Sequence, residues 1–135
     1  DAMSAVKHAN GRDWWLIARR YDPQGSSDNE FLIFLIEQDT ILETFQNIGA
    51  NELANAGNFS FSKDGTKFLA TSWNGLIEVF DFDRCTGLFS NAKVIDQGNS
   101  RYFGSAFSPN GQLIYVVKEK NAVIVRLGKK IEKKN

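Results

Sequence analysis

Cysteine, histidine and proline are all scarce in this 135-residue chain. A single cysteine excludes a disulfide within the chain, and a single histidine excludes a metal site built from paired imidazoles. The longest apolar run spans only residues 31–36, whereas a bilayer-crossing helix needs roughly 20 apolar residues. Two prolines beside 11 glycines and 13% aromatic residues favour many short strands joined by tight turns.

The chain also lacks net charge, with 16 basic and 16 acidic residues. Residues 128–135 hold four lysines and one glutamate and so carry +3, which leaves −3 on residues 1–127. This charge balance argues against a nucleic-acid partner, because proteins that bind nucleic acids usually have a strongly basic surface. We expect residues 128–135 to form a solvated, Lys-rich tail outside the folded segment.

One sequence pattern occurs three times: an apolar segment, a turn that ends in Asn-Gly or Asp-Gly, and a second apolar segment. The glycines of these turns, Gly11, Gly65 and Gly111, lie 54 and then 46 residues apart. A period of roughly 40–50 residues, with one small antiparallel sheet per repeat, is typical of a β-propeller. We therefore predict an all-β chain of about three four-stranded antiparallel blades, over about residues 1–50, 51–98 and 99–127.

Alternation of side chains and turn signals place the strands within these blades. The expected strands cover residues 5–9, 14–20, 31–37, 41–45, 58–62, 66–73, 76–83, 92–95, 103–108, 112–118 and 122–127. Residues 84–91 are expected to form a loop, and the third blade has no clear fourth strand. Segment 76–83 carries apolar side chains on both faces, which predicts a strand covered on both sides.

Two segments resemble blade sequences of large secreted proteins of the Bacteroidetes, many of which carry WD40-like or YVTN-like propellers. They are residues 8–17, His-Ala-Asn-Gly-Arg-Asp-Trp-Trp-Leu-Ile, and residues 77–91, Ile-Glu-Val-Phe-Asp-Phe-Asp-Arg-Cys-Thr-Gly-Leu-Phe-Ser-Asn. The resemblance spans about residues 6–127. It implies a secreted or cell-surface bacterial protein with a binding or adhesive role, and it brings no catalytic residues with it.

Three blades are fewer than the roughly four to eight that close a typical propeller. Isolated blades would leave apolar sheet faces and strand edges open to water. We therefore expect the chain, which opens on Asp1, to be a fragment with further blades outside it, or to close by pairing with another copy. Two copies of three blades would make a six-bladed ring.

Candidate ligand-binding residues fall at turns that a propeller gathers on one rim. They are Tyr21, Trp73, Arg101 and Tyr102. Aromatic and arginine side chains in one cluster suit recognition of a protein or a glycan. The leading prediction is a non-enzymatic binding or scaffold module that recognises protein or glycan through this loop rim.

We predict no catalytic residue, no bound metal and no cofactor. Asp81 and Asp83 could ligate Ca²⁺, but nothing near them in sequence supplies the six to eight oxygens that this ion prefers. Ser62 and Ser108 recur at the same place in two repeats, which indicates a role in the turn and not a nucleophile. The alternatives are a fragment of a lactonase-like propeller hydrolase or of a sensor propeller in a signalling protein.

Three further residues have structural interpretations. Consecutive Trp14 and Trp15 must point to opposite faces of a strand, and we expect both in the core. Cys85 is expected to be a small buried apolar side chain.

Overall fold

The computed structural model describes residues 2–20, 29–51, 57–98, 100–119, 121–127 and 131–134. Over these residues the chain forms three antiparallel sheets, each built from four consecutive strands. Sheet A contains β1 (Met3–Lys7), β2 (Trp14–Arg19), β3 (Glu30–Ile36) and β4 (Ile41–Asn47). Sheet B contains β5 (Gly57–Phe61), β6 (Lys67–Ser72), β7 (Leu76–Asp83) and β8 (Leu88–Gln97). Sheet C contains β9 (Tyr102–Phe107), β10 (Leu113–Lys118), β11 (Ala122–Arg126) and β12 (Ile131–Lys134).

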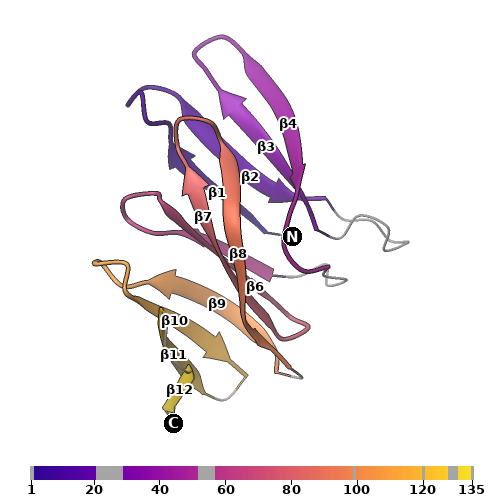
Figure 1. Ribbon diagram of the computed structural model, residues 1–135, viewed down its shortest axis with the longest axis vertical. Coiled ribbons are helices and arrows are strands. Elements are labelled where there is room, and N and C mark those ends of the chain that lie inside the picture. Colours follow the sequence, from indigo (N-terminus) through magenta and orange to yellow (C-terminus); the bar gives the residue numbers. More distant parts are fainter. Residues whose placement is uncertain are drawn as a thin grey trace.

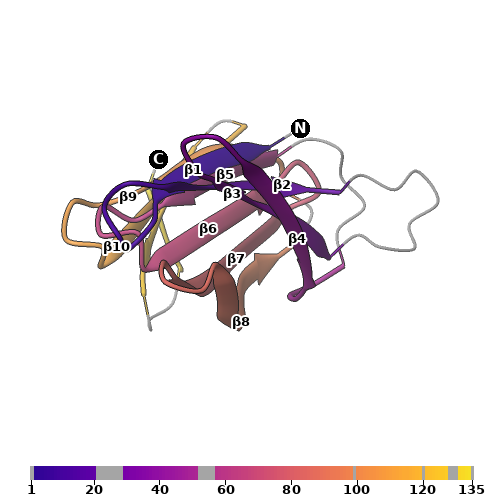
Figure 2. The same cartoon turned by 90° about the horizontal axis from the view of Figure 1, so that it is seen from above.

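The sheets stack in chain order, with sheet B between sheets A and C (Figure 1; Figure 2). The first strand of sheet B, β5, packs against the first strands of its neighbours, β1 and β9. None of the described residues belongs to a helix that could cross a membrane. The prediction of an all-β chain with three four-stranded antiparallel sheets is confirmed.

Two hydrophobic cores fill the spaces between the sheets. The core between sheets A and B is rich in aromatic rings and contains Trp15, Ile17, Phe31, Ile33, Phe59, Phe68, Ala70, Phe80, Phe82 and Phe89. The core between sheets B and C is mainly aliphatic and contains Leu69, Ile77, Val79, Tyr102, Ile114, Val116, Val123 and Val125. Strand β7 contributes to both cores, which confirms that it is covered on both faces.

The same hydrogen-bonded turn joins the first two strands of sheets B and C. In sheet B the Ser62 hydroxyl donates to the Asp64 carboxylate at 2.8 Å, and the backbone N–H of Lys67 donates to the Ser62 hydroxyl oxygen at 3.0 Å. In sheet C Ser108 donates to the Asn110 side-chain oxygen at 2.7 Å in the same way. The two serines therefore act in the turns, as the sequence predicted.

Two strand predictions are wrong. Residues 84–91 were expected to be a loop, but β8 already begins at Leu88. A short turn suffices because Gly87, with φ of 72°, lets its N–H donate to the Asp83 carbonyl at 2.8 Å. The predicted tail over residues 128–135 also contains a strand, since β12 pairs with β11 along its length.

Two side-chain predictions also fail. Trp14 was expected in the core, but it is exposed on the outer face of sheet A, whereas Trp15 is buried against sheet B. No other sheet of the described structure packs on that outer face. Alternation correctly places the two rings on opposite faces, but it does not show that only the Trp15 face is covered. Cys85 was expected to be buried, but it is exposed, because it falls in the turn before β8.

Candidate functional site

The turn between β6 and β7 and the link between β8 and β9 lie at the same end of the stack. Successive antiparallel strands reverse at alternate ends of a sheet, so this shared position follows from the strand order. The two segments are in contact, because the N–H of Gly98 donates to the Gly75 carbonyl at 3.2 Å. Gly75 permits the approach: a Cβ there would lie 2.2 Å from the Gly98 carbonyl oxygen.

Trp73, Arg101 and Phe103 form an exposed group at this end, which we call the Trp73 cluster. The ring of Phe103 meets the Trp73 ring edge-on, with centroids 4.8 Å apart and planes at 90°. The Arg101 guanidinium carbon lies 5.1 Å from the centroid of the Trp73 ring. Edge-to-face and cation–π contacts of this kind hold each side chain in place, so the cluster presents a preformed apolar surface beside a positive charge.

Tyr102 does not belong to the exposed rim, so its assignment as a rim residue is wrong. It is buried in the core between sheets B and C, and its hydroxyl donates a hydrogen bond to the Asp96 carboxylate. Burial, reinforced by that carboxylate, raises the pKa of the Tyr102 hydroxyl. Tyr21, the remaining predicted rim residue, lies outside the described residues.

Sequence reasoning missed Phe103. It directly follows Tyr102, and two consecutive aromatic side chains in a strand must point to opposite faces. This alternation was a usable signal that only one of the pair could face the core. It could not say which one, because the pairing of β9 with β10 is irregular between Val116 and Lys118.

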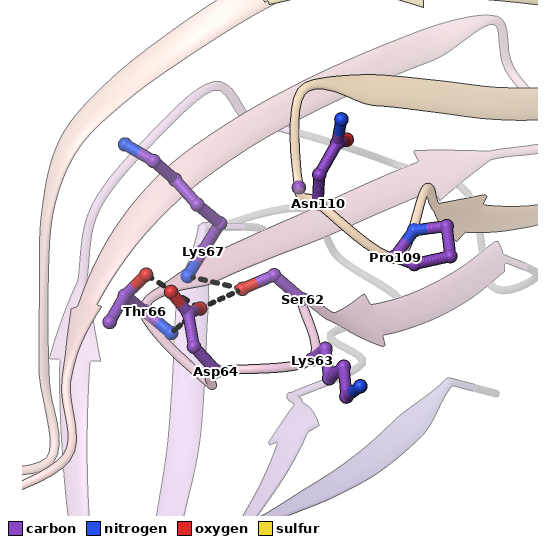
Figure 3. Close-up of a pocket in the computed structure, with 8 residues that line it drawn as sticks. Ser62, Lys63, Asp64, Thr66, Lys67, Pro109 and Asn110 are labelled. Atoms are coloured by element: carbon purple, nitrogen blue, oxygen red, sulfur yellow. Dashed lines mark hydrogen bonds between the residues drawn. The ribbon is translucent and has the colours of Figure 1, made fainter.

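The opposite end of the stack has a groove of about 450 Å³ between the β5–β6 and β9–β10 turns (Figure 3). Several of its polar groups bind within the turns or to a neighbouring strand. The Asp64 carboxylate accepts hydrogen bonds from the backbone and hydroxyl of Thr66 and from Ser62, and these bonds lower the pKa of Asp64. Lys67 forms an ion pair with Asp81. The groove is therefore a space between two structural turns.

The carboxylates considered for calcium have other partners. Asp81 also accepts a hydrogen bond from the Asn91 side chain at 2.7 Å, and Asp83 accepts one from the backbone N–H of Cys85 at 2.8 Å. Among the described residues, no three His, Cys, Asp or Glu side chains gather as metal ligands would. His8 is half-buried, and its ring stacks on Trp15 with centroids 5.2 Å apart.

Arg84 is a structural residue that the sequence pattern did not single out. Its side chain, from the β7–β8 turn, donates to the carbonyl oxygens of Lys7 at 2.8 Å and of Asp64 at 3.2 Å. Its own carbonyl accepts from the Trp15 indole at 2.8 Å. These bonds link the turns of sheets A and B at the end opposite the Trp73 cluster.

No protein-family model matches the sequence, and no curated protein matches it either. Among solved structures, the complex of KlAtg21 with the coiled-coil of AgAtg16 matches with a TM-score of 0.57 at 16% identity. The match covers 92% of this chain and 39% of that chain, so this chain spans well under half the length of its neighbour. Atg21 is a yeast β-propeller protein, and the likeness shows a β-propeller-like all-β fold for this chain.

Proposed function

We propose that this chain forms three blades of a β-propeller and serves as a non-enzymatic binding module, with the Trp73 cluster as its contact surface. The observation that supports this proposal is the preformed group of Trp73, Arg101 and Phe103 at one end of the stack. Tryptophan and arginine are among the residues most enriched where protein partners bind tightly. A ligand at this site would meet side chains that neighbouring rings already hold in place, which reduces the entropy lost on binding.

A protein ligand fits the cluster better than a glycan. The Arg101 guanidinium lies over the Trp73 ring, and Phe103 meets the edge of that ring. A sugar ring that stacked on Trp73 would therefore share the indole with a cation. The solved neighbour is a complex with a coiled-coil, which is weak additional support for protein binding by this fold. The location of the module, secreted or at the bacterial cell surface, is part of the proposal and depends on the family resemblance alone.

The hydrolase alternative gains no support from the first strands of the three sheets. A propeller hydrolase places acidic or histidine side chains from several blades along its central channel, where first strands would lie. Residues 3–7, 57–61 and 102–107 contain neither an acid nor a histidine. Three polar residues of these strands bind one another, since Ser60 donates to the Ser105 carbonyl at 2.8 Å and Ser105 donates to Asn58 at 2.8 Å.

The test is affinity capture from culture supernatant and cell-surface extract with wild-type, Trp73→Ala, Arg101→Ala and Leu88→Ala proteins. Leu88 is an exposed apolar residue on β8 and serves as the matched control. A captured protein is then purified and titrated by calorimetry against all four proteins. We expect a loss of affinity of roughly tenfold or more for the two cluster variants and no change for Leu88→Ala. Equal affinities would contradict the proposal, and binding confined to a glycan array would replace the protein ligand with a sugar.

A further inference from the structure

Both end sheets leave an apolar face uncovered in the described structure. On sheet A the face turned away from sheet B carries Met3, Trp14, Leu16, Leu32, Phe34, Ile36, Ile41 and Phe45. On sheet C the face turned away from sheet B carries Ala106, Leu113, Tyr115, Val117 and Ile124. We call these surfaces the A face and the C face. Exposed apolar areas of this kind mark interaction sites on soluble proteins.

The repeat indicates which kind of surface would fit the A face. Counting from the turn glycines, Trp14, Phe68 and Ile114 occupy the same position of the second strand in sheets A, B and C. Phe68 and Ile114 are 0% exposed, because the preceding sheet packs on them, whereas Trp14 is 43% exposed. Among the described residues, no preceding sheet packs on the A face, whereas one packs on each of its two counterparts.

The C face shows the reverse relation. Trp15, Leu69 and Tyr115 are equivalent by the same count and point toward the following sheet. Trp15 is 6% exposed and Leu69 is 0% exposed, whereas Tyr115 is 41% exposed. Faces equivalent to the C face therefore pack on the next sheet of this chain, as sheet A packs on sheet B and sheet B on sheet C. The surfaces on which they pack are equivalent to the A face.

We propose that a second copy of this chain covers both faces, with the C face of each copy packed on the A face of the other. Each new junction continues the stacking already seen from sheet A to B and from B to C. A head-to-tail contact of this type forms a closed ring or an endless polymer. Whole numbers of three-sheet chains give three, six or nine blades, and only six falls within the roughly four to eight blades of closed propellers.

The experiment measures mass in solution by light scattering over a range of protein concentrations. We expect wild type to have twice the 15.2 kDa mass of one chain. Trp14→Glu places a charge in the A face, and Tyr115→Lys places one in the C face. Each variant should have the mass of one chain, with the circular dichroism spectrum of the wild type, since both side chains are exposed in the single chain. Leu88→Lys changes an exposed residue of the middle sheet and should leave the dimer intact.

Mixing the two monomeric variants identifies which faces meet. A pair of Trp14→Glu and Tyr115→Lys chains retains one unaltered A face opposite one unaltered C face, so the mixture should recover the two-chain mass. A single-chain mass for folded wild type, or open-ended polymers, would overturn the proposal. So would a mixture that stays monomeric, or one variant that remains dimeric, because contact between like faces predicts that result.

Discussion

At the scale of single residues, Asp64 and Asn110 perform the same task with different chemistry. Each side-chain oxygen accepts from a serine hydroxyl two positions earlier and from the backbone N–H two positions later. The carboxylate is charged and the amide is neutral. The chain thus contains its own control for the contribution of charge to this turn.

The first prediction concerns the pH dependence of stability. Hydrogen bonds from Thr66 and Ser62 lower the pKa of Asp64 below its ordinary value of 3.8. A carboxyl with a lowered folded-state pKa stabilises the fold fully above its unfolded value, and this contribution is lost as the pH falls through the lowered value. Asp64→Asn should therefore remove part of the acid sensitivity while preserving the turn. Urea unfolding between neutral pH and pH of about 3 measures the free energy.

Asp64→Ala is the companion variant, because it removes the acceptor as well as the charge. It should be less stable than wild type at neutral pH, whereas Asp64→Asn should stay close to wild type. Parallel pH profiles for wild type and Asp64→Asn would contradict this account of the turn.

The second prediction distinguishes two reasons for a glycine: a positive φ, and a lack of space for a Cβ atom. Gly75 and Gly111 both have positive φ, 94° and 71°, but only Gly75 has backbone atoms where a Cβ would go. Gly111→Ala should cost about 1 kcal/mol of unfolding free energy from the left-handed backbone alone. Gly75→Ala should cost about 2–3 kcal/mol and should also move Trp73, which precedes that turn. Denaturant unfolding gives the first quantity and tryptophan fluorescence the second. Equal costs would show that the contact with Gly98 is dispensable.

At the scale of elements, the position of the middle sheet makes its strands the most sensitive to truncation. Leu69 on β6 is buried in the core between sheets B and C, whereas Leu88 on β8 is exposed. We predict that Leu69→Ala lowers the free energy of unfolding by about 2–5 kcal/mol through lost burial and the cavity that remains. The same change at Leu88 should cost less than about 0.5 kcal/mol. Chemical denaturation of both variants tests the difference, and similar losses would contradict the assignment of the second core.

Most elements of this fold were predictable from local signals, but which faces are covered was not. The three turns with Gly11, Gly65 and Gly111 mark the hairpins, because a positive φ is required there. Alternation then sorts side chains onto two faces without showing which face meets another sheet. Trp14 and Tyr102 were misplaced for that reason. Residues 131–134 were missed because pairing with β11, a tertiary property, overrides the low strand preference of a lysine-rich segment.

The candidate site was predictable in part. Trp73 and Arg101 were recognised because the strand order brings the β6–β7 turn and the β8–β9 link to one end of the stack. The exposure of Phe103 was not predictable, because it depends on the irregular strand pairing in sheet C, which no local sequence pattern indicates. Strand order therefore locates a rim, whereas the side chains exposed on it depend on register.

At the scale of the whole molecule, the described residues form two junctions between sheets, A with B and B with C, and leave the outer faces of sheets A and C uncovered. Among the described residues, only those of sheet B have both faces of their sheet covered within one chain. Backbone amides in covered strands exchange hydrogen slowly, because opening them requires disruption of a core. The single chain should therefore have one well-protected sheet between two less protected ones.

The last prediction follows from this asymmetry. In the monomeric Tyr115→Lys variant, hydrogen–deuterium exchange monitored by mass spectrometry should be slowest in β6 and β7. In wild type, β2, β3, β10 and β11 should gain protection if the proposed second copy covers the A and C faces. The protection of β6 and β7 should change least, since their faces are already packed within one chain. Leu88→Lys should reproduce the wild-type pattern. If wild type and the monomeric variant instead exchange alike at both ends of the stack, the second copy does not cover these faces, and the ring of two chains is wrong.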